Sequence, residues 1–438
     1  MLPSRLASCL LGVACAFSGV AAIAARAQVA SDTESSASEH SHKAPDDRVS
    51  SEIFRPKPGS FPPLERARAY RGELVFVDHA NRRGSLRIQT EKAFRFNSPH
   101  PFALLPYGVV RYHGAPADLR DIPLGTVLYA RAFLPPDPAT SPLPVSSHNR
   151  DASAAPPENH IALLEDEVSN CLREGEIWML QEVEIQKDRG RIVAVRSDKV
   201  SGRIKSGEQT MTLDDATRIW RGRECLSVAD LAAEGIWPAE GKKTLGGQPM
   251  LLGLIWKPTP GGVFNRFHVS DIWLDETAAQ LASQRQTETH RSFIRSRWMP
   301  AWVDLVEYGT FGRATVTATL FGGMDPALYE DFKSGTQALM NGAAPTLKHT
   351  EGGTAGPAQM AARGPILDVR KIPGDPPFGS SGIQIRFETD LITEGIRATR
   401  TIRVRPAAWP DVHMPREEYL DGSKFEERFP SPAIFPNY

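Results

Sequence analysis

Four cationic side chains crowd one segment near the end of the chain: Arg397, Arg400, Arg403 and Arg405. Because side chains two residues apart in a strand share a face, Arg403 and Arg405 should point the same way. Guanidinium groups bind carboxylates and phosphates through paired hydrogen bonds. The four arginines are therefore candidates for binding an anionic ligand, such as an acidic glycan or a phosphate. The alternative is that Glu388, Asp390 and Glu394 neutralise them as ordinary surface ion pairs.

A group of acidic side chains lies in the middle of the chain: Glu165, Asp166, Glu167, Glu174 and Glu176. Carboxylates in this number are candidates for binding Ca²⁺, which needs several oxygens converging from a shaped loop. The group lacks the glycine turns that such a loop requires. We therefore expect a solvated acidic face rather than a metal site.

His113 is followed by Asp118 and Asp121, which places a potential base and two acids in one loop. Nucleophilic catalysis would also need an aligned serine or cysteine, and no local motif supplies one. The two aspartates are better explained as turn and helix-cap residues. The sequence also lacks the common zinc, serine-hydrolase and calcium-loop motifs. These observations favour a protein that is not an enzyme and that carries no metal or cofactor.

The first 27 residues have the pattern of a secretory signal peptide. Arg5 gives a positive start, residues 10–23 form an apolar run, and Ala25-Arg26-Ala27 has the small-x-small form of a cleavage site. The apolar run is shorter than a membrane-spanning helix, and no later segment reaches spanning length without charges. We expect cleavage after Ala27 and export to the periplasm or the extracellular space, with no stable membrane span.

Export changes both the net charge and the cysteine count. Loss of residues 1–27 removes two of the 51 basic residues and none of the 52 acidic ones, which leaves a formal charge of −3. This near balance provides no field that would attract nucleic acid. Only Cys171 and Cys225 remain after cleavage, and an oxidising compartment allows them to form one disulfide. The alternative is two separately buried thiols.

A short phrase occurs three times, each time just before an expected strand. Its copies span residues 119–126, 226–235 and 328–336 and share an aspartate, an apolar residue, a few spacers and a glycine. An aspartate can cap a single helical turn, and a glycine can end that turn in a left-handed conformation. We interpret the phrase as the same structural corner in three repeated modules.

Alternating apolar and polar residues around the three copies predict strands, and proline- and serine-rich stretches separate the strand-forming regions. The predicted organisation is a signal peptide at 1–27, a disordered tether at 28–66, a first β module at 67–134, a Pro/Ser-rich linker at 135–160, a second β module at 161–260, a connector at 261–300, a third β module at 301–406 and a Pro-rich arm at 407–438. The connector contains one α-helix, capped by Asp275 and running to about Arg297, whose polar middle should lie on the surface. The predicted fold class is mainly β, with tandem small antiparallel barrels.

The three modules resemble the small OB-like β-barrel modules that recur in exported bacterial proteins. The resemblance covers residues 69–134, 177–257 and 302–406, and it rests on strand order and the Asp–Gly phrase. OB-type modules bind oligosaccharides, nucleic acids or proteins. The resemblance implies a non-enzymatic binding or scaffold protein of the cell envelope, with a protein or glycan partner. Two alternatives remain open: an envelope hydrolase whose site is assembled from distant residues, and a structural subunit of an envelope assembly.

The signal-peptide interpretation predicts that the mature protein begins at Gln28. Replacing Ala27 with tryptophan should block processing, because the residue before the cleaved bond must be small. Mass spectrometry of the N-terminal peptide from the envelope fraction measures both outcomes. An envelope-located wild-type chain that still carries Met1 would contradict the prediction.

Overall fold

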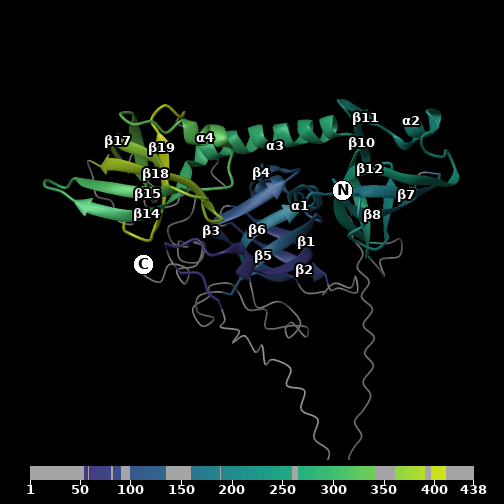
Figure 1. Cartoon of the computed structure of the whole chain (residues 1–438), viewed down its shortest axis with the longest axis horizontal. Coiled ribbons are helices and arrows are strands. Elements are labelled where there is room, and N and C mark those ends of the chain that lie inside the picture. The colour runs from purple at the N-terminus through teal and green to yellow at the C-terminus, as the bar shows by residue number, and fades with distance from the viewer. Residues whose placement is uncertain are drawn as a thin grey trace, which may run out of the picture. The chain divides into compact units, whose positions relative to one another are not determined.

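The computed structural model describes residues 54–57, 59–79, 82–89, 99–134, 159–187, 189–258, 265–341, 361–389 and 396–410. The predicted signal peptide lies outside these residues, as do most of the predicted tether, linker and C-terminal arm. The described chain is mainly β, as expected (Figure 1). Its helical segments are η1 (Leu64–Arg66), η2 (Leu119–Asp121), α1 (Glu167–Glu174), α2 (Val228–Ala233), α3 (Glu276–Arg297) and α4 (Pro326–Glu330).

The first sheet closes into a small barrel. Its strands are β1 (Arg68–Asp78), β2 (Arg83–Gln89), β3 (His100–Tyr112), β4 (Ala115–Ala117), β5 (Val127–Phe133) and β6 (His160–Asp166). They lie in the order β2-β1-β5-β6-β3-β4, and pairing between β2 and β3 closes the ring. β3 and β6 are parallel, whereas the other neighbours are antiparallel. A five-stranded ring with this order and one parallel pair is the topology of the OB fold.

The second sheet repeats this topology. Its strands are β7 (Glu176–Gln186), β8 (Arg189–Asp198), β9 (Gln209–Asp214), β10 (Arg218–Arg221), β11 (Glu224–Leu226), β12 (Gly241–Pro258) and β13 (Asn265–Trp273). β7, β8, β9, β13 and β12 form the ring, with β9 and β13 parallel where they pair. β10, β11 and α2 are inserted between β9 and β12, which is the place of η2 in the first barrel.

The third sheet is a closed barrel of a different kind. Its strands are β14 (Met299–Tyr308), β15 (Ala314–Phe321), β16 (Gln337–Asn341), β17 (Ala362–Lys371), β18 (Ser380–Thr389) and β19 (Thr401–Pro406). All six are antiparallel to their neighbours, in the order β14-β15-β18-β17-β16-β19. The third module is therefore a small antiparallel barrel without the parallel pair of the first two.

Two strands lie in other modules than the sequence indicates. The sequence places the segment 161–166 at the start of the second module, but it forms β6, the last strand of the first barrel. Likewise, β13 closes the second barrel although it falls in the predicted connector. β6 follows a long connection from β5, whereas only residues 259–264 separate β13 from β12. In neither case does the local pattern reveal which sheet the strand joins, because strand pairing is set by residues far apart in the sequence.

The repeated phrase forms the same corner in all three barrels. Its short helices, η2, α2 and α4, come directly before β5, β12 and β16. The glycine that ends each copy is left-handed: φ is +89° at Gly125, +73° at Gly235 and +81° at Gly335. The helix caps differ from the expectation, because they are Asp118, Ser227 and Asp325, which precede the aspartates of the phrase.

α3 contacts all three barrels, which its polar sequence does not suggest. Its first half lies against β10 and β13 of the second barrel. Its middle packs on the first barrel, where Gln286 Nε2 donates to Asp121 Oδ2 at 2.9 Å, and His290 is buried. Near its end, Arg291 and Arg295 form ion pairs with aspartates that flank α4 of the third barrel. Asp275 caps the helix as predicted, but the middle is not free on the surface.

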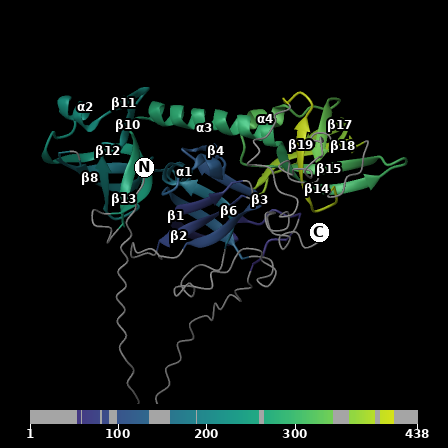
Figure 2. The same ribbon diagram turned by 180° about the vertical axis from the view of Figure 1, so that it is seen from behind.

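An aromatic cluster joins the first and third barrels directly. Tyr107 of β3 lies against Trp302 and Phe321 of the third barrel, with ring centroids 6.0 and 6.2 Å away. Phe61 adds an edge-on contact to Tyr107 at 5.4 Å. The side chains of Tyr107, Trp302 and Phe321 are almost completely buried. Such rings contribute both apolar burial and favourable edge-to-face geometry. Figure 2 shows the same elements from behind.

Two buried histidines are held neutral by the fold. Burial, together with the nearby Arg83, lowers the pKa of His160 to about 4. Burial also lowers the pKa of His290 to about 4, helped by Arg111 and Arg82 and opposed by Asp325. The unfolded chain protonates both imidazoles near pH 6.5.

These histidines predict that the free energy of unfolding decreases between pH 6.5 and 4. In that window the unfolded state binds more protons, so each histidine costs up to about 3 kcal/mol of stability at the acidic end. Urea unfolding at a series of pH values measures the slope. His290→Gln should flatten it, while His79→Gln, at an exposed position, should not. The same slope in the wild type and in His290→Gln would contradict this account.

Candidate functional site

The junction between the first two barrels is built around one buried carboxylate. β6 ends at Asp166, whose Oδ1 accepts a hydrogen bond from the Ser169 amide at 2.9 Å and caps α1. The first residue of the helix is Glu167, and its side chain is 0% exposed. An ionised carboxylate survives such burial only when charged and polar partners replace the lost water.

Both barrels supply those partners. The Glu167 carboxylate accepts hydrogen bonds from Arg71 Nη2 at 3.1 Å and from Tyr129 OH at 2.8 Å, on β1 and β5 of the first barrel. From the second barrel, Trp178 Nε1 donates at 3.1 Å, and Arg196 Nη1 lies 3.6 Å away. One carboxylate thus binds four side chains on four strands.

The remaining glutamates of the acidic group are paired as well. Arg173 Nε donates to both oxygens of Glu165, at 3.0 and 2.9 Å, and its Nη1 lies 2.6 Å from Glu174. Arg196 Nη2 lies 2.6 Å from Glu176. The expectation of a solvated acidic face is therefore wrong. Residues 165–167 are buried because β6 belongs to the first barrel and delivers them to the junction.

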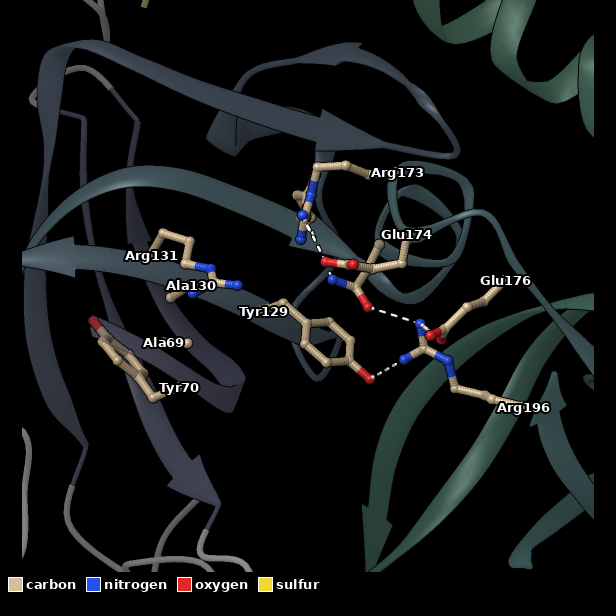
Figure 3. A pocket seen from close by; sticks show the side chains of 11 residues that line it. Ala69, Tyr70, Tyr129, Ala130, Arg131, Arg173, Glu174, Glu176 and Arg196 are labelled. Carbon is tan, nitrogen blue, oxygen red and sulfur yellow. Dashed lines mark hydrogen bonds and ion pairs between the residues drawn. The ribbon is translucent and has the colours of Figure 1, made fainter. Parts of the chain in front are cut away.

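A pocket of about 260 Å³ opens beside this network (Figure 3). It is lined by Ala69, Tyr70, Tyr129, Ala130, Arg131, Glu165, Asn170, Arg173, Glu174, Glu176 and Arg196. Ala69 and Arg131 are paired neighbours on β1 and β5, as are Arg71 and Tyr129. These four side chains share the outer face of the first barrel. The small methyl group of Ala69 leaves space beside the Arg131 side chain.

The pocket presents hydrogen-bonding side chains in fixed positions rather than an activated catalytic group. Burial raises the pKa of the Tyr129 hydroxyl, and the adjacent Glu167 carboxylate raises it further. The same two causes raise the pKa of the Cys171 thiol, whose Sγ lies 3.6 Å from Glu167 Oε1. Neither group is therefore an activated nucleophile at neutral pH.

The two cysteines are free thiols and the disulfide considered above is not formed in the structure. Cys171 is buried on α1, in the core of the second barrel. Cys225 is exposed on β11, which lies at the edge of the second sheet.

The arginines of the third module do not form one shared surface. Arg397 is exposed, whereas Arg400 and Arg405 are buried. Arg405 lies over the Trp298 ring, 5.3 Å from its centroid, and donates to the Pro410 carbonyl at 2.9 Å.

Arg403 is half-buried on β19, where its Nη1 donates to the Trp298 carbonyl oxygen at 3.3 Å. Burial, helped by the nearby Arg82 and opposed by Asp118, lowers the pKa of Arg403 to about 9. Glu388, expected as a neutralising partner, lies 3.4 Å from Arg313 instead. Binding of an anion by these arginines stays a prediction.

The residues around His113 serve the fold. Asp118 caps η2, and its amide donates to Asp121 Oδ2 at 2.9 Å, as the interpretation of both as turn and cap residues expects. The backbone amide of His113 donates to Asp166 Oδ2 at 3.0 Å. Within the described ranges, no three histidine, cysteine or carboxylate side chains converge as a metal site. Nor does any described helix combine the length and apolar character needed to cross a bilayer.

No protein-family model, curated protein or solved structure shows a significant similarity to this chain. The candidate site therefore rests on its own geometry. Its residues come from β1, β5, β6, α1, β7 and β8. The one sequence signal that pointed to them was the density of glutamates between residues 165 and 176.

The buried network predicts that Glu167→Gln destabilises the protein strongly. The substitution leaves Arg71 and Arg196 beside a neutral amide, and breaking a buried ion pair in this way costs roughly 3 kcal/mol or more. Glu276→Gln is the matched control, because Glu276 is 71% exposed and pairs loosely with Lys199 at 3.7 Å. Its loss should cost less than about 1 kcal/mol. Equal unfolding free energies for the two variants would show that Glu167 does not hold the junction.

Proposed function

We propose that this chain is a non-enzymatic exported protein of the cell envelope that binds a protein or glycan ligand through its tandem β modules. The observation that carries the proposal is the pocket between the first two barrels. Its polar walls are held by ion pairs, and Arg131 faces it without an ion-pair partner among the described residues.

A pocket with fixed walls favours binding because less conformational entropy is lost when a ligand arrives. Here Arg173 and Arg196 are each held by two carboxylates, which restrains their long side chains. The backbones of the two barrels are also joined, since the Trp256 amide donates to the Gly125 carbonyl at 2.9 Å. These contacts support a preformed site at the junction.

The OB topology of the two barrels that form the junction is consistent with this proposal. OB barrels are frequent binding modules for oligosaccharides, nucleic acids and proteins, although fold alone assigns no ligand. The signal-peptide pattern at residues 1–27 supports an envelope location, and a net charge near balance disfavours nucleic acid.

The proposal predicts that filling the pocket abolishes ligand capture. Ala69→Trp places a large ring where the methyl group leaves space, and Ala69 is exposed, so the barrel core is untouched. The full mature chain, immobilised, is exposed to envelope extract, and bound proteins and glycans are identified by mass spectrometry. Wild-type protein should retain a component that Ala69→Trp loses.

Ala229→Trp is the control for this experiment, because Ala229 is an exposed residue of α2 that does not line the pocket. It should capture the same component as the wild type. Identical capture by all three proteins would overturn the junction as the binding site. Cleavage of an envelope polymer by the wild type, lost in Ala69→Trp, would show an enzyme instead of a binding protein.

A further inference from the structure

Among the described residues, Arg131 is the pocket arginine that takes no part in the ion pairs of the junction. Arg173 and Arg196 are both committed to glutamates. Within the described parts of the chain, the Arg131 guanidinium has neither a hydrogen bond nor an ion pair. Figure 3 shows its side chain extending into the pocket, toward the side formed by Arg173 and Glu174. An arginine fork at this position has its donors available for a ligand.

The opposite wall supplies hydrogen-bond acceptors. Glu174 pairs with Arg173 through Oε1, and its side chain is 42% exposed. Glu176 contributes a second carboxylate, held through Oε2 by Arg196. Each of these carboxylates retains acceptor sites beyond its ion pair. A ligand between the walls thus meets a cation on one side and acceptors for hydroxyl groups on the other.

The charge of the pocket restricts the ligand further. Its lining holds three arginines and three glutamates, so it is formally neutral before a ligand binds. A single carboxylate on the ligand is matched by Arg131, in the paired geometry that guanidinium groups favour. A phosphate dianion would add a second negative charge beside Glu165, Glu174 and Glu176, which disfavours it.

We propose that the pocket binds a carboxylate-bearing sugar residue of an acidic glycan, with Arg131 as the carboxylate anchor. Hydroxyl groups of the same residue donate to Glu174 and Glu176. The volume of about 260 Å³ lies just below the usual range for ligand pockets, which limits the ligand to about one sugar ring. This inference rests on the proposed binding function and names the ligand class for that site.

Isothermal titration calorimetry of the mature chain tests the inference with defined probes. Trigalacturonate and N-acetylmuramic acid carry the required carboxylate, and maltotriose is a neutral trisaccharide with the same α-1,4 linkage as the first. The wild type should bind at least one acidic probe and bind maltotriose about tenfold more weakly or worse, because a charge-assisted paired contact is lost. Arg131→Gln should lose a similar factor for the acidic probe.

Arg285→Gln is the matched control, since Arg285 is exposed on α3 and does not line the pocket. It should bind the acidic probe like the wild type. Binding of neither acidic probe, or equal binding by wild type and Arg131→Gln, would overturn the inference. So would inorganic phosphate that competes as well as the sugar acid. If ligand capture from extract still depends on Ala69 in any of these cases, the binding function stands and only the acidic-sugar assignment fails.

Discussion

The buried carboxylate of Glu167 is the constraint on which the junction of the first two barrels depends. Removing an ionised carboxylate from water is costly, and the cost is offset only when several donors surround it. Those donors are Arg71 and Tyr129 on one barrel and Trp178 and Arg196 on the other. Separating the barrels would take one of these two pairs of donors away from the carboxylate. The two OB barrels are therefore held in a fixed relation, and the pocket beside Glu167 keeps its shape.

The third barrel is held to the first mainly by apolar contact rather than by buried charge. This contact is largely aromatic, through Tyr107, Trp302 and Phe321. α3 adds a second connection, because it packs on the first two barrels and pairs through Arg291 and Arg295 with the third. Buried apolar contact is insensitive to direction, whereas buried charge demands specific geometry. A polar ligand site is therefore expected where the charges converge, at the first junction.

The proposed function follows from the pocket side chain that is not engaged by the ion pairs of the junction. Ion pairs with glutamates engage Arg173 and Arg196, and they restrain these side chains as walls of the pocket. Arg131 points into the same pocket without such a partner in the described structure. A site of this kind can hold a ligand with both an acid group and hydroxyl groups. The raised pKa values of Tyr129 and Cys171 give it no activated nucleophile.

The sequence by itself determined the features that depend on short-range interactions. The helix capped by Asp275 and the corners ended by Gly125, Gly235 and Gly335 were all predictable, because capping and positive φ act within a few residues. The site was decided by tertiary structure alone. Arg71 lies 96 residues from Glu167 in the chain, so no local pattern shows that it neutralises this carboxylate. For the same reason the acidic residues 165–167 looked like a solvated surface, until the pairing of β6 with β3 and β5 placed them between two barrels.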